Sequence, residues 1–146
     1  MADLAAIKNN VRNLIKAEFG SVSEDNDGDM FIKNESSVTF VTLYDWNYGG
    51  ENVGVVQVWA IVARGLPEIN KDLAVELTTT LERRFCGWRF IQRDDGKFNL
   101  LLSSSLIGAT IDQAELATAV GVVAINSNDL DDQIVAKYGG SVFAGE

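Results

Sequence analysis

Histidine is absent from this 146-residue sequence, which removes most familiar catalytic arrangements. Histidine is a common general base and metal ligand, and it activates serine and cysteine nucleophiles. The phosphate-binding patterns GxGxxG and GxxxxGK[ST] do not occur either. The acid pairs Asp94-Asp95 and Asp131-Asp132 are expected in a turn and on a helix, where adjacent side chains point apart. We assign no catalytic residue and predict that the chain is not an enzyme, although chemistry using only Asp, Glu, Tyr, Ser or Lys stays open.

The single cysteine, Cys86, is a further candidate for covalent chemistry. Arg83, Arg84 and Arg89 lie close to it in the sequence, and nearby cations lower the pKa of a thiol. Cys86 also stands at the end of an apolar helical stripe, where we expect it to pack as a small hydrophobic residue. A lone cysteine excludes a disulfide within the chain and fits a reducing compartment.

The segment Asp25-Asn26-Asp27-Gly28-Asp29 has the composition of a calcium-binding loop. An EF-hand loop places glycine at its sixth position and a bidentate glutamate at its twelfth. If Gly28 is the sixth position, the twelfth is Asn34, so the strongest ligand is missing. We therefore expect a solvated turn before a strand, and we assign neither a metal nor a cofactor to the chain.

Acidic residues outnumber basic ones by 21 to 12, which gives a net charge of −9. Such a surface repels phosphate backbones and anionic lipids, so nucleic acids and membranes are poor partners, and basic or amphipathic protein segments match it better. The first residues lack the basic region and apolar run of a signal peptide. No stretch approaches the ~20 apolar residues of a membrane span. These features predict a cytoplasmic protein.

Apolar spacing predicts three helices. The first runs from Leu4 through Ile15 and closes at Phe19-Gly20, with glycine as the cap. The second begins at Pro67, which suits a first helical turn, and carries an apolar residue at every fourth position: Ile69, Leu73, Leu77, Leu81 and Phe85.

A capping box at Thr110 and Gln113 predicts the start of the third helix. This helix either continues through Leu130 and Ile134 or breaks near Asn126-Ser127-Asn128 and restarts. Tyr138-Gly139-Gly140 ends it in both cases.

Five segments are expected to be strands, and short turns between them predict antiparallel pairing. Asn47–Glu51 and Asp94-Asp95-Gly96 are typical of hairpin connections, whereas 103–108 is expected to be a loop. The expected strands are Met30–Ile32, Val38–Trp46, Val53–Ala63, Trp88–Ile91 and Phe98–Leu102. The order α-β-β-β-α-β-β-α predicts an α+β fold, an antiparallel sheet packed by helices, in a single domain spanning residues 1–146.

The strand Val53–Ala63 is apolar on both faces, so both must be covered. A helix on each face, or simply a larger core, would cover them; so would a second subunit or a ligand. We favour pairing Trp46 with Val53, because that register puts Thr42 beside Gln57 and leaves neither polar side chain buried alone. One face then carries aromatic residues, and we predict that it binds a partner or a second subunit. Its candidate binding residues are Phe40, Tyr44, Trp46, Val55, Gln57 and Trp59.

The element order resembles that of type III secretion chaperones, and the C-terminal third resembles YbjN-like peptide-binding chaperones. The resemblance in sequence lies in Leu100–Leu106, in Asp112–Leu116 and in the segment Asn128–Gly140, which contains Asp-Leu-Asp-Asp and ends on Gly-Gly. It implies a non-enzymatic chaperone or adaptor, often dimeric, that binds an extended segment of another protein. It supplies no functional residue that can be carried over.

We therefore expect a homodimeric chaperone-like domain that binds a protein or an extended peptide through strand edges and an apolar, aromatic sheet surface. The alternative is a sensory or regulatory domain in which the aromatic hairpin and Asp25–Asp29 bind a small molecule or a metal.

Overall fold

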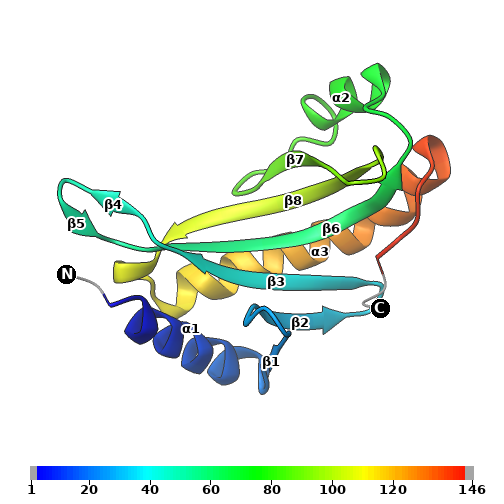
Figure 1. Cartoon of the computed structure of the whole chain (residues 1–146). Helices are drawn as coiled ribbons and strands as arrows, with labels where there is room; N and C mark the ends of the chain where they lie inside the picture. Colours follow the sequence, from blue (N-terminus) through cyan, green and yellow to red (C-terminus); the bar gives the residue numbers. More distant parts are fainter. Residues whose placement is uncertain (1–2, 144–146) are drawn as a thin grey trace.

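The computed structural model describes residues 3–143, and its elements follow the predicted α+β order (Figure 1). Five strands form the body of the sheet, and three two-residue strands accompany them. The helices are α1 (Leu4–Phe19), α2 (Lys71–Leu77) and α3 (Gln113–Tyr138), and a 3-10 turn covers Gly108–Thr110. The strands are β1 (Ser23–Glu24), β2 (Met30–Asn34), β3 (Ser37–Tyr44), β4 (Asn47–Tyr48), β5 (Glu51–Asn52), β6 (Val55–Leu66), β7 (Gly87–Gln92) and β8 (Phe98–Ile107).

The sheet is antiparallel, with the strand order β1-β2-β3-β6-β8-β7. The strands β4 and β5 pair only with each other and form a small hairpin that projects from one end of the sheet (Figure 1). The long strand β6 lies in the middle and pairs with β3 on one side and β8 on the other. The strand expected over Val53–Ala63 is therefore central in the sheet, but it begins at Val55 and continues to Leu66.

The register between β3 and β6 is the favoured one. Phe40 lies opposite Trp59, and Tyr44 lies opposite Val55. Beyond β3 the amide of Val53 donates to the carbonyl of Trp46 over 2.8 Å. Because side chains alternate along a strand, this register separates an aromatic face from a uniformly aliphatic one.

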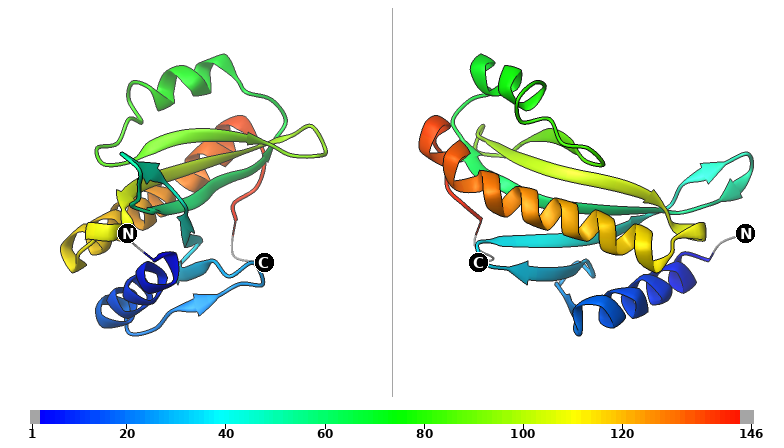
Figure 2. Two further views of the ribbon diagram at one scale, coloured as in Figure 1. Left: turned by 60° about the vertical axis from the view of Figure 1, so that its left-hand side comes forward. Right: turned by 180° about the vertical axis from the view of Figure 1, so that it is seen from behind.

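All three helices pack on the aliphatic face (Figure 2). Over one half of the sheet, Val56 and Val58 of β6 pack with buried residues of α1 and of the first half of α3. Over the other half, α2 and the end of α3 bury Val62, Leu100 and Leu102. In the described part of the chain no helix covers the opposite face, which we call the open face.

The first helix begins and ends as its residues predict. Asp3 caps it by accepting from the amide of Ala5, and Gly20 ends it in the left-handed region with φ of 80°. Near its start, Ile7 contacts Gly54, where a Cβ atom would lie 2.9 Å from Ile7 Cδ1. Gly54 also has a φ of 61°, so both its backbone and this close packing need glycine.

Helix α3 runs unbroken from Gln113 to Tyr138, so the break proposed near residues 126–128 does not occur. The polar side chains there find partners instead of interrupting the helix. Asn126 accepts from Arg83 Nε over 2.8 Å, and Asn128 Oδ1 lies 2.7 Å from Ser36 Oγ. The predicted capping box was wrong by two residues: Asp112 and Glu115 cap each other's amides over 2.8 and 3.1 Å.

Strand β8 and helix α2 also differ clearly from prediction. Strand β8 continues through Ile107 where a loop was expected, because Ser103–Ile107 pair with β6. Helix α2 spans only Lys71–Leu77, so Pro67 precedes it and the stripe of every fourth residue is interrupted after Leu77. The hydroxyls of Thr78 and Thr79 donate to carbonyls one turn back, which competes with the helix, and Phe85 is 74% exposed.

Candidate functional site

The open face brings together five of the six residues predicted to bind a partner. Phe40 and Tyr44 project from β3, and Val55, Gln57 and Trp59 project from the facing positions of β6. The sixth residue, Trp46, follows β3 at the base of the β4–β5 hairpin and is 56% exposed. Their common location follows from the register, and their role in binding stays a prediction.

An aromatic pair forms the centre of this face. The rings of Phe40 and Trp59 stack with centroids 4.4 Å apart and planes inclined by 17°. The indole Nε1 of Trp59 donates to Thr42 Oγ1 over 2.9 Å, which orients the ring. Phe31 on β2 extends the cluster, 6.1 Å from Phe40. Trp59 remains partly exposed, so it offers a rigid apolar surface with its polar atom already satisfied.

The C-terminal segment reaches the same face, which sequence reasoning missed. Ser141 pairs with Arg64 at the end of β6 through two backbone hydrogen bonds of 2.8 Å. Gly140 permits this approach, because a Cβ atom there would lie 2.6 Å from the Arg64 carbonyl oxygen. Phe143 then lies beside Phe40, with centroids 6.1 Å apart, and the Arg64 guanidinium stands 5.9 Å from its ring. The one signal for this contact in the sequence is the pair of apolar residues Val142-Phe143, which follows shortly after Gly139-Gly140.

Two cavities of opposite character lie toward the two ends of β6. Near the β4–β5 hairpin, a mostly apolar cavity of about 320 Å³ is lined by residues that include Trp46, Tyr48, Val55 and Ile107. At the other end, a cavity of about 590 Å³ is lined by Arg64, Gly65, Pro67, Arg93, Lys97, Gly139, Gly140 and Ser141. Along β6, the open face therefore carries an apolar region near Trp46, the stacked pair of Phe40 and Trp59 at its centre, and a cluster of cationic side chains near Arg64.

The sheet also has two edges. Strand β7 ends the sheet on one side, and β1 covers only Met30 and Phe31 of β2 on the other. Beyond β1, the residues Ile32–Asn34 form an edge, beside a cavity of about 500 Å³ that Phe19 and Phe31 help to line. Such an edge can accept an added strand.

Cys86 does not have the environment of an activated thiol. It is half-buried at the junction of the two hydrophobic clusters, as its expected packing role requires. Burial raises the pKa of the Cys86 thiol, and the opposing effect of the Arg83 charge is smaller.

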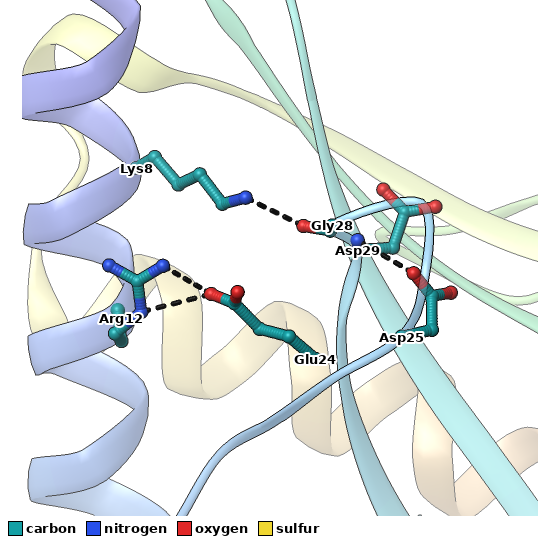
Figure 3. A network of polar contacts seen from close by, with 6 residues as sticks. All are labelled: Lys8, Arg12, Glu24, Asp25, Gly28 and Asp29. Carbon is teal, nitrogen blue, oxygen red and sulfur yellow. Dashed lines mark hydrogen bonds and ion pairs between the residues drawn. The ribbon is translucent and has the colours of Figure 1, made fainter.

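The Asp25–Asp29 segment forms a turn that joins β1 to β2 and faces α1 (Figure 3). Asp25 Oδ1 accepts from the amides of Asp27 and Asp29 over 3.0 and 2.9 Å. Lys8 Nζ donates to the Gly28 carbonyl over 2.7 Å, and Arg12 pairs with Glu24. Within residues 3–143, no group of three or more Cys, Asp or Glu side chains could hold a metal ion.

The fold is that of a small α+β protein whose antiparallel sheet, within residues 3–143, is covered by helices on one face only. The family model described as "T3SS (YopN, CesT) and YbjN peptide-binding chaperone 1" matches residues 5–146, and the chain belongs to this family. The resemblance noted in the sequence is thereby confirmed. A comparison with curated protein sequences found no match.

Solved structures share the fold at low sequence identity. The ExsC–ExsE complex aligns with a TM-score of 0.61 and 11% identity, covering 90% of this chain and 96% of that one. YbjN from E. coli aligns with a TM-score of 0.63 and 14% identity, covering 86% and 92%. The Yersinia pestis chaperone SycH, in complex with a fragment of YscM2, gives 0.54 and 13%, covering 84% and 98%. Within residues 3–143, no helix is long and apolar enough to cross a membrane.

Proposed function

We propose that this chain is a non-enzymatic chaperone or adaptor that binds an extended segment of a partner protein on its open sheet face. The observation that carries the proposal is the stacked Phe40–Trp59 pair, which remains partly exposed on a face without a helix in the described chain. Exposed apolar patches of this kind mark interaction sites. Membership of a peptide-binding chaperone family supports the same reading.

The chemistry of the face suits an extended segment. Its aromatic and aliphatic side chains offer contact area, and Thr42, Gln57, Ser103 and Ser105 offer hydrogen bonds in the middle. The edge at Ile32–Asn34 could add main-chain hydrogen bonds. In ExsC–ExsE and in SycH–YscM2 a protein of the same fold is bound to another protein or its fragment, which is consistent with this proposal. We place the protein in the cytoplasm, because its one cysteine fits a reducing compartment.

The experiment selects binding peptides from a library of random 12-residue sequences displayed on phage, with the full chain as bait. The affinity of a selected peptide is then measured for the wild type, Trp59→Ala and Val58→Ala. We expect Trp59→Ala to weaken binding by about 2 kcal/mol or more, as loss of an aromatic hot spot does, and to leave the fold largely intact.

Val58 is the matched control, because it neighbours Trp59 on β6 but is fully buried under the helices. Val58→Ala should lower the melting temperature through a core cavity and should leave the affinity of the folded protein largely unchanged. If Trp59→Ala unfolds the domain while Val58→Ala does not, the two faces are assigned the wrong way round. If selected peptides bind equally well without Trp59, the open face is not the binding site.

A further inference from the structure

The charges on the open face run opposite to the charge of the whole chain. The net charge is −9, yet the strand residues that face this side within residues 3–143 include no Asp or Glu. The cations placed on this face or at its end are Lys33, Arg64, Arg89, Arg93 and Lys97. The acids Asp94 and Asp95 stand beyond the strands in the β7–β8 turn, where Asp95 pairs with Arg93 over 3.0 Å.

Three of these cations converge on one cavity. Arg64, Arg93 and Lys97 line the cavity of about 590 Å³, and a Cβ atom on Gly65 would meet Arg93 Nη1 at 3.3 Å and Lys97 Cδ at 3.8 Å. The side chains from the β7–β8 turn therefore reach back over β6. We call Arg64, Arg93 and Lys97 the cationic end. It lies at the end of β6 opposite the β4–β5 hairpin (Figure 1).

We infer that the cationic end binds a carboxylate side chain of the extended segment that occupies the open face, so that the preferred partner segment is acidic as well as apolar. This inference rests on the proposed function and names the chemistry of its partner. Converging cations in a partly enclosed cavity raise the local concentration of anions even on an acidic protein. Guanidinium groups bind carboxylates with directional hydrogen bonds. The local charge thus overrides the preference for basic segments that the net charge predicted.

The distance between Trp59 and Arg64 also predicts how far apart the contacting residues of the partner segment lie. Trp59 and Arg64 are separated by five positions on β6, which is at most roughly 16 Å at about 3.3 Å per residue, because the pairing of β6 with β8 shifts register after Ile61. An extended segment running along β6 would place its acidic residue about four or six residues from the aromatic or aliphatic residue that packs on Phe40 and Trp59, because only residues an even number apart face the same side. The apolar cavity at Trp46 and Tyr48 would take an apolar residue at the opposite end.

The test repeats the random-peptide selection with two variants of equal net charge. Arg64→Glu/Lys97→Glu reverses the cationic end, and Lys16→Glu/Lys71→Glu reverses two exposed lysines on α1 and α2 as the matched control. Wild type and control should select peptides with Asp or Glu about four or six residues from an apolar anchor. The reversed variant should lose this preference and bind the wild-type peptides about tenfold more weakly, with the control much less affected.

A double-mutant comparison locates the contact. Replacing the peptide's acid by its amide should weaken binding to the wild type and should have little further effect on Arg64→Glu/Lys97→Glu. Selected peptides without acidic enrichment, or equal losses in the two charge variants, would overturn the inference. The proposed function would survive that result if Trp59→Ala still weakened binding as expected. A failure to select any peptide, or binding that ignores Trp59, would overturn both.

Discussion

Asp131 on α3 is an acidic side chain only 1% exposed, and its contact with Ser36 joins the helix to the β2–β3 turn. Its carboxylate lies 2.8 Å from Ser36 Oγ and accepts from the amide of Asp132 over 2.7 Å. We expect Asp131→Ala to lower the free energy of unfolding by about 1–3 kcal/mol, because the groups around it lose a buried acceptor. Urea unfolding followed by circular dichroism measures this change.

The adjacent Asp132 is the control, since it is exposed on the same helical turn. Asp132→Ala should change stability by no more than about 0.5 kcal/mol. Equal effects of the two substitutions would show that the network at Ser36 contributes nothing to folding.

Among the elements, α1 is joined to the β1–β2 turn by the Lys8–Gly28 hydrogen bond and to β1 by the Arg12–Glu24 pair, and the strength of this pair depends on pH (Figure 3). The hydrogen bond from Arg12 is the main cause that lowers the pKa of Glu24 below its ordinary value of 4.5. A carboxyl whose pKa is lower in the folded state stabilises the fold above its unfolded pKa, and this contribution disappears as the pH falls through the folded pKa.

Glu24→Gln should therefore destabilise the protein at pH 7 and have progressively less effect as the pH falls below about 4.5. The effect should stay under about 1 kcal/mol, because both side chains are about one-third exposed and water screens the pair. Melting temperatures of wild type and variant across this range test the prediction, with the exposed Glu51→Gln in β5 as the control. A difference that persists unchanged in acid would contradict it.

At the scale of the whole molecule, we predict a homodimer whose contact leaves the open face to the partner. Exposed apolar residues also occur on and after α2: Val75 on the helix is 51% exposed, and Phe85, which lines a cavity with Leu106 and the first turns of α3, is 74% exposed. Specific interfaces bury on the order of 1,600 Å² in total, and these side chains would contribute to such an area. Light scattering at micromolar concentration should give about twice the chain mass of 15.9 kDa.

Val75→Glu should shift this mass toward one chain, and Trp59→Ala should leave it unchanged. A mass of one chain for the wild type at every concentration would refute the dimer. Dissociation caused by Trp59→Ala would instead place the second copy on the open face, in competition with a partner segment.

Much of the sheet could be predicted from local patterns. Alternation along 38–46 and 53–63 specified which residues share a face, because a shift of one residue would bury Gln57 without Thr42 beside it. Turn residues such as Gly20 and Gly96 marked element ends because both take positive φ, at 80°. For these reasons five of the six candidate residues could be placed on one surface before the structure was known.

The remaining features depend on residues distant in the chain, and local patterns do not contain them. Asn126-Ser127-Asn128 would favour a helix break in isolation, yet contacts from Arg83 and Ser36 keep α3 continuous. Residues 103–107 resemble a polar loop until they pair with β6. That all three helices pack on one face, that Phe143 reaches Phe40, and that Arg64 meets Arg93 and Lys97 at one cavity were decided only by the tertiary structure. Periodicity reports which side of its own strand or helix a residue occupies, whereas the partner on that side is set by packing between elements.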